Sequence, residues 1–294
     1  MRASSILLGV LVLVLAISTV SIWFFPSVQD FMAANTMWNG IRDFMSTFKA
    51  TNIESLSNLP SSPEKSAIVE IPYLPHSEKE LPILKQFVED GGTLILMDDF
   101  GFGNNVLEYL GLEARFSTKP LVDPLFNYRN QVFPRITDFS PDVKNSGVNV
   151  IVFDHGTALT DVASSNVIAW SSAASFLDTE GKGNWSQGEP KGPLPVAASF
   201  RLGQGTVDIV SDPSIIISSM MGRDDNYRFV AYLVGGRQVL FDSSSLPKAP
   251  LDQSKTALLS FRQLLADPYI LVIITAATTV IVSAHTLRRR ETVA

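Results

Sequence analysis

Two long apolar stretches stand near the two ends of the chain. The first, SSILLGVLVLVLAISTVSIWFF, lies within residues 1–25, and the second, PYILVIITAATTVIVSAHTL, covers residues 268–287. Each is long enough to cross a hydrocarbon core of ~30 Å at ~1.5 Å per residue of helix. The pattern therefore predicts a transmembrane helix at each end, with one domain, residues 26–267, between them.

The few charges that flank these stretches indicate their orientation. Arg2 precedes the first stretch, and Arg288 to Arg290 begin a short basic tail, residues 288–294, after the second. Because positive charge gathers on the cytoplasmic side, we expect both termini in the cytoplasm and the central domain outside the cell membrane. A cleaved signal peptide is the alternative for the first stretch, since small residues near Ala16 could form a cleavage site.

Between the ends, short apolar runs alternate with helical patterns. SAIVEIPY and TLILM are typical of strands, and between them residues 81–90 predict a helix that ends at Gly91-Gly92. A short helix is expected at 105–110. Such strand-helix-strand units pair their strands in parallel through right-handed crossovers. The prediction is an α/β domain with a largely parallel sheet flanked by helices.

The second half of the domain continues this pattern with one reversal. PVAASFRL and TVDIV flank Gly203-Gln204-Gly205 and predict a hairpin. VNVIVF and NVIAWSSAASF predict two more strands, and RQVLF, after a helix expected at 225–234, predicts the last one. A helix at 251–265 leads toward the second apolar stretch. Residues 116–144 have no clear period, so no element is predicted there.

Four apolar runs end on aspartate: LILMDDFG, VIVFDHG, VDIVSDPS and QVLFDSSS. The residues concerned are Asp98, Asp99, Asp154, Asp212 and Asp242, with His155 after one of them. If the strands are parallel, their carboxyl ends share one edge, where α/β sheets bind ligands. Carboxylates and an imidazole gathered there could hold a divalent cation such as Mg²⁺ or Mn²⁺. The alternative is structural, since aspartate satisfies backbone N–H groups in turns and helix caps.

The pair Asp98-Asp99 is the strongest candidate, because the fully apolar run before it makes its position at the sheet edge most secure. The turn Gly101-Phe102-Gly103 resembles a phosphate-binding turn, but the third glycine of the dinucleotide pattern is missing and no Walker lysine follows. The candidate ligand-binding residues are Asp98, Asp99, Gly101, Gly103, Asn104, Asn105, Asp154 and His155.

Composition excludes several classes of protein. The net charge is -6, which argues against binding nucleic acid through a basic patch. With no cysteine, the chain has no disulfide framework, thiol nucleophile or cysteine-based zinc site. It carries no cofactor motif and no G-x-S-x-G elbow, so no cofactor and no serine triad are expected. Of the histidines, His155 is better placed than His76 or His285 to act as a base. Asn184-Trp185-Ser186 is a candidate glycosylation triplet.

Three stretches carry a family resemblance: NTMWNG, GGTLILMDDFG with NNVLEYLGL, and GQGTVDIVSDPSIIISSMMGRDDNYRFVAYLV. Together they resemble a family of archaeal and bacterial membrane proteins with domain of unknown function 4350, whose outer domain is similar to class I glutamine amidotransferases. The last stretch is also similar to the auxiliary domains of gliding-motility-type ABC transporters. The resemblance implies a flavodoxin-like sheet held by two anchors. An amidotransferase needs a cysteine nucleophile, which this chain lacks, so the resemblance implies the fold without the chemistry.

These observations favour a non-catalytic, membrane-anchored outer domain that binds a partner protein or a small ligand. Its partners would be other membrane or envelope proteins, in assembly, maturation or transport. One alternative is a metal-dependent hydrolase that uses Asp98, Asp99 and His155. Another is an accessory subunit of an ABC-type exporter.

Overall fold

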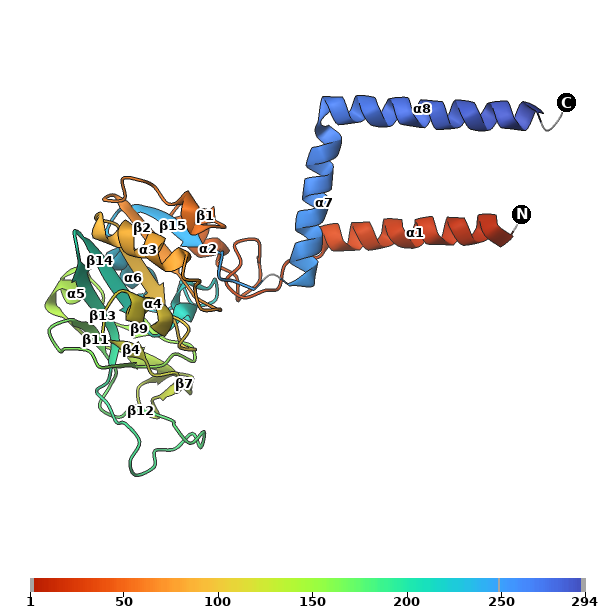
Figure 1. Ribbon diagram of the computed structural model, residues 1–294. Helices are drawn as coiled ribbons and strands as arrows, with labels where there is room; N and C mark the ends of the chain where they lie inside the picture. Colours follow the sequence, from red (N-terminus) through yellow and green to blue (C-terminus); the bar gives the residue numbers. More distant parts are fainter. Residues whose placement is uncertain (1–2, 248, 292–294) are drawn as a thin grey trace. The chain divides into compact units, whose positions relative to one another are not determined.

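The chain is divided into two compact units. The computed structural model describes residues 3–247 and 249–291. One unit comprises residues 26–247, called the α/β domain below, and the other comprises the chain up to residue 25 and from residue 248 onward. Figure 1 shows the first as a sheet with helices and the second as long helices.

The helical unit contains α1 (Ala3–Phe24), α7 (Pro250–Ala266) and α8 (Pro268–Glu291). Among the described residues, α1 alone is long and apolar enough by itself to cross a membrane, with a mean hydropathy of 2.6 over residues 6–24. Helices α7 and α8, up to Val280, qualify only as one pair, which is bent by 81°. An apolar N-terminal helix that could span a membrane is thus confirmed, and the second span stays a prediction.

The bend between α7 and α8 has a local cause. Proline at the first position of α8 disfavours a helical conformation for the residue before it. That residue, Asp267, is extended, with φ -71° and ψ 121°. Its Oδ1 then accepts a hydrogen bond from the Tyr269 N–H at 2.8 Å, which caps the new helix.

The α/β domain is built on an eight-stranded sheet. Five neighbouring strands run parallel, and the hairpin then adds three antiparallel strands at the other side. The mixed α/β fold with a large central sheet is therefore confirmed, with five of the eight strands in the parallel part. In spatial order the strands are β1 (Thr51–Ile53), β15 (Gln238–Asp242), β2 (Ser66–Glu70), β3 (Thr93–Met97), β14 (Gly205–Val210), β13 (Pro195–Leu202), β11 (Val167–Trp170) and β8 (Asp138–Phe139).

Helices cover both faces of this sheet because alternate side chains of its central strands point to opposite sides. Leu94 and Leu96 of β3 belong to one apolar cluster, with side chains of α3 (Glu80–Glu89) and α4 (Asn104–Tyr109). Ile95 and Met97 belong to another, with side chains of α2 (Arg42–Thr47) and α6 (Asn226–Val234). The predicted helices at 81–90, 105–110 and 225–234 are confirmed.

The predicted hairpin is also confirmed, as β13 and β14 joined at Gly203. Although β14 turns back on β13, it pairs in parallel with β3, with Val210 opposite Met97. Strands β2, β3, β14 and β15 thus finish at the same end of the sheet, called the carboxyl edge below. The aspartates after β3, β14 and β15 all lie at this edge.

The rest of the domain is a region of short strands and turns. The predicted strand VNVIVF is reduced to β9 (Ile151–Val152), which joins β6 (Asn127–Tyr128) and β7 (Asn130–Ile136) in a separate small sheet. Two further sheets have two strands each, β4 with β10 and β5 with β12. The remaining elements are η1 (Leu56–Asn58), β4 (Arg115–Phe116), β5 (Leu121–Val122), α5 (Pro141–Asn145), β10 (Leu159–Thr160), β12 (Phe176–Leu177) and η2 (Pro213–Ile216).

Candidate functional site

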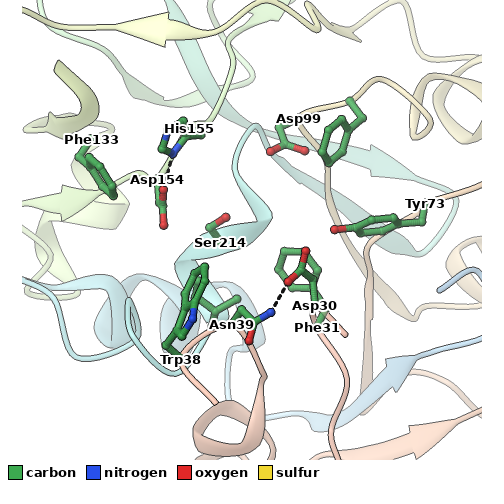
Figure 2. A pocket seen from close by; sticks show the side chains of 12 residues that line it. Asp30, Phe31, Trp38, Asn39, Tyr73, Asp99, Phe133, Asp154, His155 and Ser214 are labelled. Atoms are coloured by element: carbon green, nitrogen blue, oxygen red, sulfur yellow. Dashed lines mark hydrogen bonds and ion pairs between the residues drawn. The ribbon is translucent and has the colours of Figure 1, made fainter. Parts of the chain in front are cut away.

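A pocket of about 320 Å³ opens at the carboxyl edge (Figure 2). Segments that are far apart in the sequence meet there: the loop before α2, the turns after β2, β3 and β9, and the turn that follows β14. The lining residues are Asp30, Phe31, Trp38, Asn39, Tyr73, Asp99, Phe100, Phe133, Asp154, His155, Ser214 and Ile217. Three of the predicted site residues, Asp99, Asp154 and His155, are therefore brought together in one pocket.

The NTMWNG stretch forms one wall through its first asparagine. Asn35 is fully buried, accepts from the Met37 N–H at 2.8 Å, and donates to the Asn39 side-chain oxygen at 2.9 Å. Gly40 closes the turn, because a Cβ there would lie 2.0 Å from the carbonyl oxygen of Asn35. The turn presents Trp38, which is 64% exposed, to the pocket, and Asn39 donates to the carboxylate of Asp30 (Figure 2).

The two aspartates after β3 have different roles. The oxygens of Asp98 accept from the N–H groups of Phe100 at 2.9 Å and Gly103 at 2.6 Å, so this side chain holds the turn that starts α4. It is buried and does not line the pocket. Asp99 points the other way, into the pocket (Figure 2).

The turn residues predicted with Asp98 also serve the backbone. Gly101 has a φ of +93°, which favours glycine. A Cβ at Gly103 would lie 2.9 Å from the ring of Phe116. Asn104 accepts from the N–H of Phe116 at 2.8 Å and donates to its carbonyl oxygen at 3.1 Å. Neither these three residues nor Asn105 line the pocket.

Asp99 carries the least satisfied polar atom of the pocket. Its Oδ1 is buried and has no hydrogen-bond partner among the described residues. Burial is the largest of the effects that together raise the pKa of Asp99 to about 7. The negative charges of Asp98 and Asp154 add to it, and His155 opposes it. A carboxyl group with such a pKa, in a pocket and with a free acceptor, is typical of a functional site.

Asp154 and His155 form a pair on the opposite side of the pocket. Nδ1 of His155 lies 2.6 Å from Oδ1 of Asp154, and its ring stands edge-on to Phe133 at 5.3 Å. His155 has a φ of 59°, in the left-handed region that a side chain with a Cβ adopts at a cost of about 1 kcal/mol or more. This conformation directs the imidazole into the pocket mouth.

Asp212 fixes the backbone of two segments that line the pocket, the turn with Asp154 and His155 and the turn with Ser214. It is fully buried; its Oδ2 accepts from the Asp154 N–H at 2.6 Å and its Oδ1 from the Ser214 N–H at 2.7 Å. Burial raises the pKa of Asp212 well above its usual value, while these two N–H groups oppose the shift. Asp212 is thus a positioning residue for two lining residues, Asp154 and Ser214.

Sequence reasoning expected Asp242 at the carboxyl edge but missed the group that it forms there with two further side chains. Glu70, His76 and Asp242 are buried, and one ligand atom from each lies within 4.8 Å of the others. The sequence favours His155 over His76 as a base, yet His76 is the histidine that pairs with a buried acid, with its Nε2 2.7 Å from Oε1 of Glu70. The available signal was an acid at the end of two neighbouring strands, SAIVE and QVLFD.

Two predicted features lie elsewhere. Asn184 is exposed in the loop between β12 and β13, a position that a glycosylation site requires. Asp242 belongs to the second group and not to the pocket.

Comparison with known proteins gives one family and several distant structural likenesses. No curated protein matches the chain. The mmIFT52 N-terminal domain is 14% identical with a TM-score of 0.45, over 58% of this chain and 77% of that one. A beta-galactosidase from Bacillus circulans sp. alkalophilus is 13% identical with a TM-score of 0.37, over 59% of this chain and 23% of that one.

The exo-beta-1,4-mannosidase Op5Man5 from Opitutaceae bacterium strain TAV5 is 16% identical with a TM-score of 0.32, over 60% of this chain and 26% of that one. The chain thus spans about a quarter of the length of these two glycosidases. TM-scores below 0.5 are too low to support a shared function. The family described as Domain of unknown function (DUF4350), in contrast, matches residues 33–234, more than half of the sequence. The chain therefore belongs to the DUF4350 family.

Proposed function

We propose that the protein is a membrane-anchored, non-catalytic domain whose pocket binds a small ligand with a positively charged ammonium group. The observation that carries this proposal is the lining of the pocket. It combines three aspartates with five aromatic side chains, and none of its twelve residues is a lysine or an arginine. Acids beside aromatic faces are the combination that recognises organic cations.

The acids supply the charge complementarity. Asp30 is held by Asn39, and Asp154 by His155, but Asp99 keeps one buried oxygen without a partner. An ammonium N–H that donates to this oxygen would satisfy it and favour the ionised carboxylate. The ligand would thus repay the cost of burying this acid.

The aromatic side chains supply the apolar surface. Phe31 and Tyr73 lie 5.9 Å apart, and Tyr73 and Phe100 5.8 Å apart, both measured between ring centroids. Trp38 and Phe133 belong to other segments of the lining. A cation within about 6 Å of a ring centroid gains about 0.5–2 kcal/mol. A pocket of about 320 Å³ has the size of a small-molecule site.

The family resemblance also points to this pocket as the binding site. The three stretches that carry it are distant in the sequence, yet each contributes to this lining, through Trp38, Asp99 and Ser214 respectively. A shared role of the family in ligand binding would account for this convergence.

We further infer the cellular setting from the ends of the chain. Helices α1 and α8 would both cross the cell membrane, with the basic residues at the two termini in the cytoplasm and the α/β domain outside. The sheet would be flavodoxin-like, as in class I glutamine amidotransferases. Ligand binding would then serve assembly, maturation or transport with other envelope proteins, of which an ABC-type exporter is one case. A metal-dependent hydrolase is less well supported, because both oxygens of Asp98 already accept backbone N–H groups.

The proposal predicts that two substitutions remove ligand binding. We expect alkylammonium compounds to raise the thermal midpoint of the full-length protein in detergent at pH 8. Trp38→Ala and Asp99→Asn should each weaken this binding by about tenfold or more, because each removes about 1.4 kcal/mol or more of cation–π or charge-assisted interaction.

Matched substitutions outside the pocket serve as controls. Trp185→Ala removes another exposed tryptophan, and Asp138→Asn removes an aspartate whose side chain is 63% exposed. Both should bind as the wild type does. If no ammonium compound stabilises the wild type, or if the controls weaken binding as much as the pocket variants do, the proposal is wrong.

A further inference from the structure

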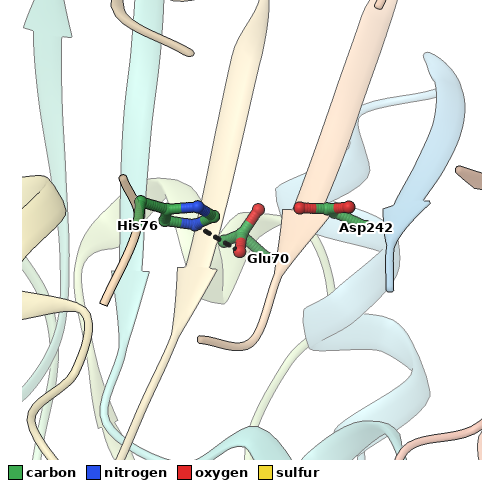
Figure 3. Close-up of side chains that lie close together, drawn as sticks. All are labelled: Glu70, His76 and Asp242. Carbon is green, nitrogen blue, oxygen red and sulfur yellow. Dashed lines mark hydrogen bonds and ion pairs between the residues drawn. The ribbon is translucent and has the colours of Figure 1, made fainter. Parts of the chain in front are cut away.

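The group Glu70, His76 and Asp242 lies where two parallel strands end. Glu70 of β2 and Asp242 of β15 are register partners in neighbouring strands. Both follow, by two residues, side chains of the apolar cluster that packs under α3, so both point to the α3 side of the sheet. His76 comes from the segment that leads into α3 (Figure 3). The group is therefore made of three segments and shares no residue with the pocket.

The hydrogen bonds of the group leave one oxygen unsatisfied. Oε1 of Glu70 has His76 Nε2 at 2.7 Å and the Ser245 hydroxyl at 3.1 Å. The oxygens of Asp242 accept from the N–H of Ser244 at 2.9 Å and from its hydroxyl at 2.8 Å. Oε2 of Glu70, on a fully buried side chain, has no partner among the described residues.

This unpartnered oxygen is directed into the group. Figure 3 shows one Glu70 oxygen bound to His76 and the other facing the carboxylate of Asp242. Two ionised carboxylates whose oxygens lie within 4.8 Å repel each other, and a proton or a cation between them relieves this repulsion.

We propose that Glu70, His76 and Asp242 bind a divalent transition-metal ion, Zn²⁺ or Mn²⁺, in a buried site. Imidazole and carboxylate are the ligands that these ions take in proteins without cysteine. In a tetrahedral site with bonds of ~2.0–2.1 Å, two ligand atoms lie ~3.3 Å apart. The observed group already meets this within small side-chain shifts, since its atoms lie within 4.8 Å of one another.

The ion would cross-link the ends of β2 and β15 to the segment before α3. On binding, it displaces to solvent the proton held between Glu70 and His76 and any proton shared between Glu70 and Asp242. The imidazole then keeps its one proton on Nδ1 and presents Nε2 to the metal. The hydroxyl of Ser245, which already contacts Glu70, is the neighbouring group that could orient the carboxylate. The site is built of buried side chains, so its role is to stabilise the carboxyl edge and not to act on a substrate.

The test measures metal content and stability of the full-length protein in detergent. After chelation and dialysis against Zn²⁺ or Mn²⁺, we expect about one equivalent of metal per chain by inductively coupled plasma mass spectrometry. The ion at a hundredfold its dissociation constant should raise the thermal midpoint by about 5–10 °C. Glu70→Gln and Asp242→Asn, which keep the side-chain shapes, should lose both the metal and the shift.

Two controls separate this site from other acids. Asp208→Asn changes another buried carboxylate of the same sheet and should keep the metal. Asp99→Asn alters the pocket and should also keep it, so the result does not depend on the proposed ammonium site. A wild-type protein that retains neither ion and gains no stability overturns the proposal, even if the variants fail to fold. Metal that is lost in Asp99→Asn but kept in Asp242→Asn overturns it as well.

Discussion

Replacement of Asp212 by alanine is expected to lower the free energy of unfolding by about 2–4 kcal/mol. The reason is that Asp212 is fully buried and accepts from two backbone N–H groups, those of Asp154 and Ser214. Alanine would leave both donors without a partner in a site that water does not reach. Part of this loss is offset because the cost of burying the carboxylate disappears. Urea unfolding of the full-length protein in detergent, followed by tryptophan fluorescence, measures the difference.

The position of Asp212 also gives this substitution an effect on the pocket. Without it, the turn that carries Asp154 and His155 loses its anchor, so ammonium binding should weaken together with stability. Asp138→Ala, at an exposed position in a surface ion pair with Lys144, should change the free energy of unfolding by less than about 1 kcal/mol. A change at Asp212 as small as the change at Asp138 would show that Asp212 does not support the pocket.

The second large effect concerns pH. Because the pKa of Asp99 is about 7 in the folded protein and has its usual value of 3.8 in the unfolded chain, the folded state keeps a proton that the unfolded state has lost. The contribution of Asp99 to the free energy of unfolding is therefore fully present below about pH 4 and is lost as pH rises to about 7. The slope from this one group is at most about 1.4 kcal/mol per pH unit.

Asparagine at position 99 cannot ionise, so the pH dependence of the free energy of unfolding that Asp99 causes disappears. Asp99→Asn should match the wild type near pH 4 and exceed its free energy of unfolding by about 2–4 kcal/mol at pH 8. Asp138→Asn is the control and should follow the wild type at every pH. The titratable groups whose charges interact with Asp99 are Tyr73, Asp98, Asp154, His155 and Asp212. All five are present in the wild type and in Asp99→Asn. Parallel curves for wild type and Asp99→Asn would contradict the raised pKa.

The fold was predictable where the pattern is long and periodic. The strand TLILM and the helix at 81–90 were located correctly, because burial on both faces of a strand and on one face of a helix leaves a clear pattern. The run VNVIVF looked equally strand-like, yet little of it forms a strand. The N–H groups of Asn149 and Val150 donate to the side chain of Asp225, which comes from a distant turn. Hydrogen bonds from a backbone to a side chain that is distant in the sequence cannot be predicted from the local pattern of residues.

The site was predictable only in part, for a related reason. The rule for parallel strands located Asp99 at the carboxyl edge, but could not separate it from Asp98, since the two differ only in the side to which they point. It does not account for Asp154, because β9 lies in a separate antiparallel sheet. Trp38 and Tyr73 lie in irregular segments, and only the folded chain brings them to the pocket. The antiparallel part of the sheet, three of its eight strands, was underestimated because a strand as short as β8 is too short to show a period.

The central claim, that the pocket recognises positive charge, is tested most directly by isothermal titration calorimetry with a matched pair of ligands. One is the tightest-binding primary alkylammonium compound, and the other is its neutral isostere, in which a methyl group replaces the charged –NH₃⁺ group. At pH 8, with Asp99 largely ionised, the cation should bind at least about tenfold more tightly than the isostere, and Asp99→Asn should reduce this ratio. Equal affinities for the two compounds in the wild-type protein would contradict the proposed function.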